Sequence, residues 1–333
     1  MNINKEKIKN ILVTGGAGYV GSMLVPKLLK QKYKVTVIDL MIYGTNYFEK
    51  NKNLKLIKGD IRDKKLIEKI TKKQDVVIHL ACISNDPSFE LNPSLGKSIN
   101  LDAFEPLVKI SKKNKVKRFI YASSSSVYGI KKVKNVIETM KLNPLTDYSK
   151  YKAKCEKILN RYGSENFVVT TIRPATVCGY GPRQRLDVVV NILSNLAFHN
   201  RKITVFGGSQ LRPNIHMKDM VDVYLKLIKA PKENINFEIF NAGGKNQTVI
   251  ELAKDVKSIM GKDVKIIKMK SSDKRSYHIS SEKIFKVLKF KTKHTVKNAA
   301  RDLKKAFQKN LFKDPLKNKK YFNIKTMQSI KLK

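Results

Sequence analysis

The sequence has few cysteines and few histidines. Its 333 residues include three cysteines, Cys82, Cys155 and Cys178, and five histidines. Three cysteines without paired spacing exclude a disulfide framework and indicate reduced thiols, as in a cytoplasmic protein. No Cys/His spacing of the kind that binds zinc occurs, so we expect no metal site.

Long apolar runs are also missing. No run approaches the roughly 20 residues that a membrane helix needs, and the first ten residues are charged and polar, unlike a secretory signal. We therefore expect a cytoplasmic protein without membrane insertion. The hydrophobic content of 41% is ordinary, and a chain of this length can bury a substantial core in one or two lobes.

Acidic residues are scarce relative to basic ones. The chain has 27 Asp+Glu against 69 Lys+Arg, a formal net charge of +42. Such an excess can attract nucleic acid, acidic membrane surfaces or anionic ligands. The lysines, however, are spread along the whole chain, with few arginines or aromatic residues between them. We therefore favour a solvated lysine-rich surface and expect no nucleic-acid partner.

Glycines gather where the first strand is expected to end. Residues 9–14 are expected to form a short buried strand, and the turn 15–21 reads Gly-Gly-Ala-Gly-Tyr-Val-Gly before an amphipathic helix. Backbone amides in such a turn can approach a pyrophosphate, and the helix amino end favours its negative charge. The strand–turn–helix context predicts a dinucleotide site. Its residues are Gly15, Gly18, Tyr19, Val20 and Gly21.

An acidic residue ends the second expected strand. Residues 34–38 are followed by Asp39, eighteen positions after Gly21. A carboxylate there can accept hydrogen bonds from a ribose and repel a 2′-phosphate. Asp39 therefore favours NAD over NADP.

Further strands are expected at residues 54–57 and 75–81. Strands that alternate with helices predict a parallel sheet covered on both faces, with the cofactor at the carboxyl ends of the strands. These strands add four residues to the expected cofactor site: Asp60, Ile61, Leu80 and Ala81. His79 lies inside an apolar run, which is typical of a satisfied core histidine and not of a catalytic one.

Hydroxyl groups and a Tyr–Lys pair mark the candidate reaction centre. Serines 123–126 follow the apolar run 118–122, and Tyr148 and Lys152 open a helix expected to reach about residue 162. Residues four apart share a helix face, so both can point toward the serines. A neighbouring ammonium favours phenolate. Lowering the pKa of Tyr148 from about 10 to about 7 needs roughly 4 kcal/mol, which we expect Lys152 and a positively charged nicotinamide ring to supply.

The loop after residue 177 interrupts the alternation of strands and helices. We predict a Rossmann domain over residues 1–177, to which residues 204–248 return. Residues 178–203 and 249–309 are expected to form a substrate-binding lobe with helices at about 248–260, 280–289 and 295–308. Residues 310–333 are basic and weakly patterned, and we expect them to form a tail.

With these motifs in order, the chain resembles the extended short-chain dehydrogenase/reductase family, in its nucleotide-sugar epimerase/dehydratase branch. The motifs that carry the resemblance are the turn 14–21, Asp39, Gly59-Asp60, His79-Leu80-Ala81, Asn100, the serine run, Tyr148 with Lys152, Arg173-Pro174, the Gly-Pro-Arg-Gln loop, and Arg212, His216 and Asp219. The resemblance implies an α/β fold, a Rossmann-type doubly wound parallel sheet with a smaller C-terminal substrate-binding lobe. It also implies bound NAD, a nucleotide-diphosphate-sugar substrate, and a homodimer formed by the helix carrying Tyr148 and the helix before it.

The resemblance further assigns roles to individual residues. Ser124 would be the catalytic hydroxyl, Tyr148 the base and acid, and Lys152 the activator of Tyr148 and a ribose contact. The substrate contacts would be Asn85, Ser124, Ser125, Thr176, Arg212 and Arg275. Dehydratases of the family carry an Asp-Glu pair where this chain has Ser125-Ser126, so elimination is disfavoured.

The prediction is therefore C4 epimerisation through a transient 4-keto sugar, in the manner of a UDP-glucose 4-epimerase, with hydride transfer to and from bound NAD. The first alternative is a 4-keto-sugar reductase that uses the same residues and consumes reduced cofactor. A more distant alternative is a non-catalytic protein that binds NAD or a polyanion.

Overall fold

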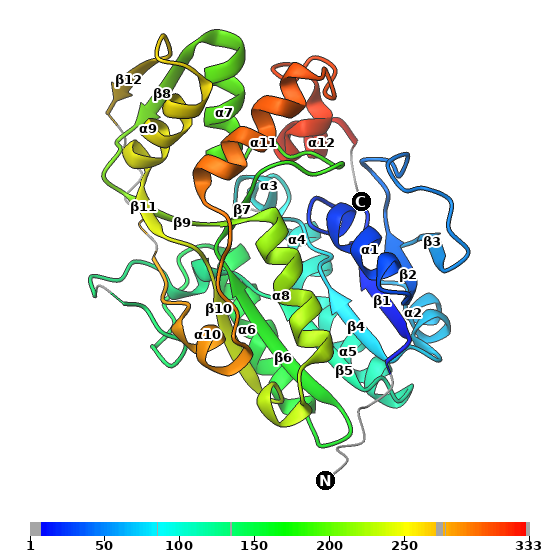
Figure 1. Ribbon diagram of the computed structural model, residues 1–333. Helices are drawn as coiled ribbons and strands as arrows, with labels where there is room; N and C mark the ends of the chain where they lie inside the picture. Colours follow the sequence, from blue (N-terminus) through cyan, green and yellow to red (C-terminus); the bar gives the residue numbers. More distant parts are fainter. Residues whose placement is uncertain (1–7, 85, 134, 271–275, 277, 331–333) are drawn as a thin grey trace.

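The computed structural model describes residues 8–330 except 85, 134, 271–275 and 277. Its centre is a parallel sheet with the strand order β10-β6-β5-β4-β1-β2-β3 (Figure 1). The strands are β1 (Asn10–Thr14), β2 (Lys34–Asp39), β3 (Leu54–Lys58), β4 (Val76–His79), β5 (Arg118–Ala122), β6 (Val168–Pro174) and β10 (Glu238–Ala242). The predicted Rossmann-type doubly wound sheet is confirmed.

Helices cover both faces of this sheet. One face is covered by α1 (Gly21–Lys30), α8 (Met217–Lys229) and α10 (Glu282–Leu288), and the other by α2 (Lys64–Thr71), α5 (Phe104–Lys113) and α6 (Asp147–Tyr162). Successive strand side chains point to opposite faces. In β1, Ile11 and Val13 therefore enter one core and Leu12 the other. Burial on both faces explains why the central strands β1 and β4 are largely apolar.

The remaining short helices lie mostly between the strand ends. They are α3 (Asp86–Glu90), α4 (Pro93–Lys97), a π-helical turn (Ser98–Asp102), and 3-10 turns at Ser125–Tyr128, Lys232–Asn234 and Lys319–Tyr321. The helical stretch from residue 98 to 113 is thus divided, because the π-helical turn precedes α5.

A smaller lobe begins where the chain leaves β6 (Figure 1). It contains α7 (Val189–Asn200), α9 (Val249–Met260), α11 (Val296–Gln308) and the parallel pair β8 (Lys202–Phe206) and β12 (Lys265–Met269). Its core is formed largely by side chains of these helices and strands. A second small sheet connects the two parts and consists of β7 (Thr176–Cys178), β9 (Leu211–His216) and β11 (Asn246–Thr248).

Two segment boundaries differ from those expected. Residues 204–248 were expected to return to the Rossmann domain, and α8 and β10 do so, but β8 pairs with β12 in the smaller lobe. The expected helix at 280–289 was assigned to the lobe. The observed α10 instead packs against β10, where Ile284 and Leu288 join the core of the Rossmann domain.

The expected basic tail at 310–333 is corrected by the structure, which shows a folded segment as far as residue 330. Phe312 and Phe322 are buried in a cluster with Leu186, and the backbone N–H of Leu186 donates to the carbonyl of Tyr321 at 2.8 Å. The last helix, α12 (Asn323–Ile330), packs against α3. The sequence pattern missed this because two isolated phenylalanines among lysines show no periodicity, and their partners are far away in the chain.

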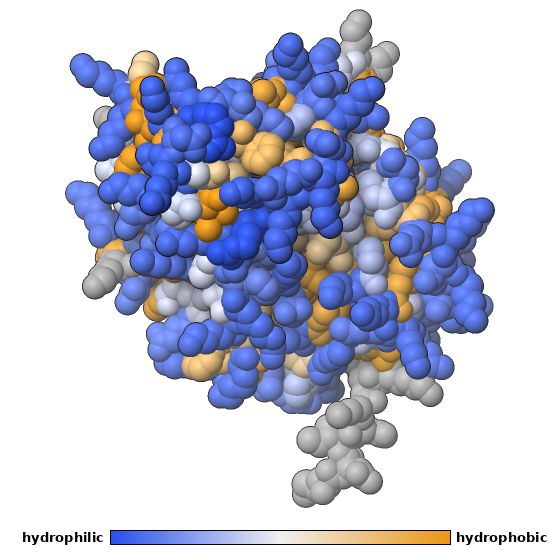
Figure 2. Space-filling model, turned by 45° about the horizontal axis from the view of Figure 1, so that its top comes forward, coloured by the Kyte–Doolittle hydropathy of each residue, from blue (hydrophilic) through white to orange (hydrophobic). Residues whose placement is uncertain are grey.

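Hydrophilic side chains cover most of the face shown in Figure 2 and are spread over it without gathering in one patch. This distribution agrees with a solvated lysine-rich surface. Within the part of the chain that the structure describes, no helix combines the length and the apolar character that crossing a membrane requires.

Candidate functional site

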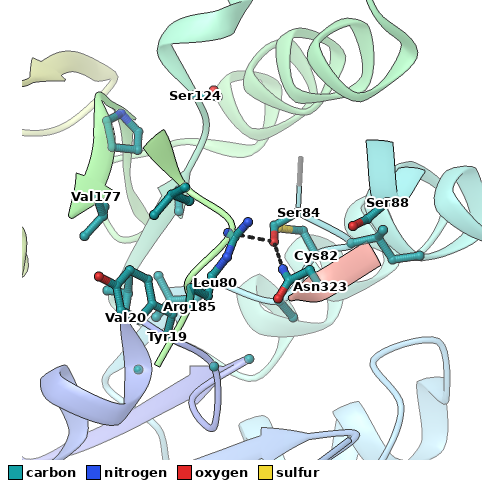
Figure 3. A pocket seen from close by; sticks show the side chains of 18 of the residues that line it. Tyr19, Val20, Leu80, Cys82, Ser84, Ser88, Ser124, Val177, Arg185 and Asn323 are labelled. Carbon is teal, nitrogen blue, oxygen red and sulfur yellow. Dashed lines mark hydrogen bonds between the residues drawn. The ribbon is translucent and has the colours of Figure 1, made fainter. Parts of the chain in front are cut away.

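A cavity of about 560 Å³ lies at the carboxyl ends of β1, β2, β4 and β5 (Figure 3). Most of the residues expected in the site line it: Gly15, Gly18, Tyr19, Val20, Gly21, Asp39, Asp60, Ile61, Leu80, Ala81, Ser124, Ser125, Tyr148, Thr176 and Arg212. Lys152 is not among the lining residues. Asn85 and Arg275 lie outside the described residues.

The glycine turn forms one end of the cavity. Gly15 has a φ of +70°, and a Cβ at this position would come within 2.5 Å of the backbone nitrogen of Ala81. Only glycine therefore allows the turn to lie this close to the end of β4. The turn leads into α1, whose amino end also lines the cavity at Gly21. This cradle fits the pyrophosphate of a dinucleotide.

Asp39 is fixed beside the glycine turn. Its carboxylate accepts hydrogen bonds from the backbone N–H of Ala17 at 3.0 Å and of Met41 at 2.8 Å. Burial raises the pKa of Asp39, and these two hydrogen bonds and the charge of Arg183 act in the opposite direction. The carboxylate thus has a fixed position in the cavity wall, as a ribose-binding group requires. Gly15, Gly18, Gly21 and Asp39 would hold NAD at this end.

The other end of the cavity contains Ser124 and Tyr148. Helix α6 begins just before Tyr148 because Thr146 caps it, forming a capping box with Ser149. The Thr146 hydroxyl also donates to Asp86 Oδ1 at 2.6 Å, which ties the start of α6 to α3. Ser124 precedes the 3-10 turn after β5, and its Oγ lies 2.9 Å from Ser126 Oγ. The end of β5 and the start of α6 therefore bring the serine and the tyrosine together.

The pKa of Tyr148 differs from the sequence expectation. Burial raises it well above its usual range, and the hydrogen bond with Ser124 and the charge of Arg185 lower it only in part. The Lys152 ammonium lies 5.8 Å from the centroid of the Tyr148 ring and donates to the Ala122 carbonyl at 2.7 Å. The expected lowering by Lys152 included the charge but omitted desolvation. Without a cofactor, Tyr148 is therefore a neutral phenol at neutral pH.

His79 is a core histidine, as predicted. It is 2% exposed, and its Nδ1 lies 2.7 Å from the Thr14 hydroxyl. Burial, aided by the nearby charge of Lys152, lowers the pKa of His79 to about 3. The ring is therefore neutral at physiological pH and stacks on Tyr121 beneath the site.

A buried ion pair supports the serine strand from below. The Arg173 Nη2 lies 2.6 Å from Glu156 Oε2, with the two side chains 3% and 4% exposed. The Ser123 hydroxyl donates to Glu156 Oε1, and Arg173 Nη1 donates to the Tyr128 hydroxyl at 2.8 Å. This network connects β6, α6 and the turn that carries Ser124.

The cavity also contains polar residues that the sequence did not single out. Arg183, Arg185 and Asp187 come from the loop before α7, Ser84 follows β4, and Asn323 opens α12. Figure 3 shows that Arg185, Ser84 and Asn323 form a connected row beside Cys82. Arg183 belongs to the Gly-Pro-Arg-Gln motif, which marked the loop but not its side-chain roles. Asn323 had no local signal, since it lies in the segment expected to be a tail.

Every aspartate that lines the cavity already has a partner. Asp39 is bonded to backbone amides, Asp60 pairs with Arg62, Asp86 accepts from Thr146, and Asp187 pairs with Arg185. Neither Ser125 nor Ser126 can supply a carboxyl group. Ser124 and Tyr148 therefore present hydroxyl groups at the reaction end, and the nearby carboxylate of Asp86 is already bonded to Thr146.

The chain is similar to known enzymes in sequence. The model of the NAD dependent epimerase/dehydratase family matches residues 11–243. The UDP-glucose 4-epimerase of Lactobacillus helveticus is 28% identical over 307 residues, covering 85% of this chain and 92% of the relative. A putative UDP-glucose 4-epimerase of Methanocaldococcus jannaschii is 34% identical over 262 residues, covering 75% and 82%. The human dTDP-D-glucose 4,6-dehydratase is 30% identical over 261 residues, covering 74% and 73%.

Solved structures give the same grouping. The UDP-glucose 4-epimerase of Thermotoga maritima, solved with UDP-glucose, has a TM-score of 0.82 at 28% identity and covers 91% of this chain and 100% of its own. The UDP-glucuronic acid 4-epimerase of Bacillus cereus, solved with UDP-glucuronic acid and NAD, has a TM-score of 0.81 at 27% identity, with 90% and 99% covered. Both similarities extend over the two lobes.

Proposed function

The chain belongs to the NAD-dependent epimerase/dehydratase family, and on that premise we propose that it inverts C4 of a nucleotide-diphosphate sugar through a transient 4-keto sugar. Membership of the family makes the protein an enzyme with NAD as its cofactor. Its relatives include both epimerases and dehydratases at comparable identity. Overall similarity therefore does not distinguish epimerisation from dehydration. The residues of the site have to distinguish the two reactions.

The observation that carries the proposal is a hydroxyl pair followed by two serines, with the nearby carboxylate of Asp86 already hydrogen-bonded to Thr146. Ser124 and Tyr148 face each other in the cavity, and positions 125 and 126 are serines. Elimination of a sugar hydroxyl needs an acid that protonates the leaving group. Since the aspartates of the cavity are held by other partners, the site favours oxidation and reduction at a single carbon over elimination.

In this proposal each residue has a specific task. Tyr148 accepts the proton of the C4 hydroxyl and returns it, and Ser124 holds the C4 oxygen against the phenol. Lys152 provides positive charge behind Tyr148. Arg212, Thr176 and Ser125 bind the sugar and its diphosphate, for which a guanidinium is well suited. NAD, when bound, supplies the hydride acceptor and donor.

The raised pKa of Tyr148 favours a second candidate function. A neutral phenol is a ready proton donor, as the reduction of a 4-keto sugar requires, whereas epimerisation begins with a phenolate. A reductase would exchange its cofactor at every turnover. An epimerase recycles NAD without releasing it, so the two functions differ in cofactor content.

The deciding experiment is to purify the protein, denature it and identify any released nicotinamide nucleotide. We expect stoichiometric NAD, followed by interconversion of C4 epimers in a panel of nucleotide sugars that includes UDP-glucose and UDP-glucuronic acid. An empty protein that oxidises NADH or NADPH in the presence of a 4-keto sugar would establish the reductase instead. Failure to bind either form of the nicotinamide would overturn both functions.

We also propose a cytoplasmic homodimer formed through α5 and α6. The three cysteines are free thiols, which supports a reducing compartment. The exposed faces of the two helices carry Lys109, Lys154 and Lys157, so two copies would bring like charges together. Because salt screens such repulsion, we expect light scattering to show a dimer that is favoured at high ionic strength. A monomer at low and high salt alike would contradict the dimer.

A further inference from the structure

We infer that Asn323, on the C-terminal helix α12, is a positioning residue of this active site and acts through the hydroxyl of Ser84. The inference rests on the proposed function, because it assigns Ser84 to the binding of a substrate oxygen. It extends the site to a segment that follows the last helix of the smaller lobe, beyond the residues of the family model.

Asn323 is hydrogen-bonded to the cavity wall through its backbone and through both ends of its side-chain amide. It is 6% exposed. Its side-chain nitrogen donates to Ser84 Oγ at 2.8 Å, its side-chain oxygen accepts from Arg183 Nη2 at 2.6 Å, and its backbone N–H donates to Asp187 Oδ2 at 2.8 Å. One residue thus fixes the loop after β4 and the loop before α7, on two sides of the cavity.

The hydrogen bonds that Ser84 Oγ accepts determine which acceptor remains for its own hydroxyl proton. Ser84 Oγ accepts from Asn323 and, at 3.2 Å, from Arg185 Nη1. Amide and guanidinium N–H groups only donate, so both bonds occupy the lone pairs of the oxygen. The Ser84 hydroxyl keeps a proton for which the described residues offer no acceptor. Since Ser84 lines the cavity (Figure 3), an oxygen atom of a bound ligand is the acceptor within its reach.

The adjacent arginines indicate the chemistry of that ligand. Arg185 Nη2 and Arg183 Nε are buried without hydrogen-bond partners, a costly state for donors of a charged group. Arg183 is otherwise held by Asn323 and by stacking on Tyr43 at 3.5 Å. Arg185 lies close enough to Tyr148 for its charge to act on the phenol. The free donor of Arg185 therefore favours an oxygen-rich substrate at the reaction end of the cavity.

A purely structural role for the segment would act through different residues. Phe312 and Phe322 provide the apolar packing. Thr326, which is 4% exposed on the same helix, donates its hydroxyl to the carbonyl of Lys319 within the segment. Thr326→Val therefore removes a buried hydrogen bond of α12 without touching the cavity, and it serves as the matched control.

The experiment compares Asn323→Ala, Ser84→Ala, the double variant and Thr326→Val in the NAD-loaded full chain. With UDP-glucose, or the nucleotide sugar that the panel identifies, we expect kcat/KM to fall about tenfold in each single variant, mainly through KM. Because Asn323 acts through Ser84, the double variant should lose no more than either single variant. Thr326→Val should match the wild type, and NAD content should be unchanged throughout.

Asn323→Asp provides a nearly isosteric second variant. Its carboxylate can accept a hydrogen bond from Arg183 but cannot donate one to Ser84. The Ser84 hydroxyl would instead donate its proton to this carboxylate and not to the substrate, so we expect the same tenfold loss of kcat/KM. Wild-type kcat/KM in Asn323→Ala, additive losses in the double variant, or an equal loss in Thr326→Val would each overturn the inference. If the wild type binds UDP-glucose in calorimetry but does not turn it over, the proposed function fails. The role of Asn323 is then tested by comparing the Kd for UDP-glucose, and not the KM, between the wild type and each variant. A wild type that binds no nucleotide sugar would overturn both.

Discussion

Replacing Glu156 by Gln should destabilise the fold more than any exposed charge change. Glu156 and Arg173 lie beneath the serine turn with 4% and 3% of their side chains exposed. Arg173 donates to Glu156 from Nη2 at 2.6 Å and from Nε at 3.0 Å. Removing one member of a buried pair leaves the other charge uncompensated and costs about 3–5 kcal/mol.

The expected loss lies in the lower part of that range. Glutamine keeps one oxygen acceptor for Arg173, so we expect the free energy of unfolding to fall by about 3–4 kcal/mol. Since a native domain is stable by only about 5–15 kcal/mol, this loss is large. Urea unfolding followed by circular dichroism measures it as a shift of the midpoint with an unchanged slope.

Glu105→Gln is the control for this measurement. Glu105 pairs with Arg161 at 3.1 Å, but the two side chains are 43% and 65% exposed. An exposed pair of this kind contributes at most about 1 kcal/mol. Equal and small losses for Glu156→Gln and Glu105→Gln would refute the view that desolvated charge supports the serine turn.

Two other predictions concern titrating side chains. Tyr148→Phe should lower kcat by about 10²–10⁴-fold, because it removes the proton carrier, while the NAD found after denaturation stays stoichiometric; unchanged turnover would exclude Tyr148 as base. Burial lowers the pKa of His79 to about 3 from its ordinary value of 6.5. The unfolded state therefore binds the extra proton, and stability should decline as the pH falls from 6.5 toward 3, by up to about 1.4 kcal/mol per pH unit. In urea titrations His79→Gln should flatten that decline relative to the wild type, and an identical pH dependence of the two proteins would contradict the buried neutral ring.

The sequence determined the features that depend on neighbouring residues. The sequence predicted the strands β1, β2, β3 and β4, and burial on both faces explains the apolar runs of β1 and β4. The glycine turn and Asp39 stand at strand ends, where a parallel sheet places its ligands. Tyr148 and Lys152 share a helix face through a spacing of four. Since these relations are local or follow from strand order, the cofactor end of the cavity could be predicted from the sequence.

Only the tertiary structure decided what depends on burial and on distant partners. Charge counting predicted a lowered pKa for Tyr148, but desolvation, which the sequence does not express, raises it. Asn323 had no periodic or motif signal, and its partner Ser84 lies 239 positions away. The same holds for Phe312 and Phe322, whose apolar partner Leu186 comes from the loop before α7. Solvent exclusion and long-range contacts arise only when the chain has folded. They decide the protonation state of Tyr148 and the contribution of the C-terminal segment to the cavity wall.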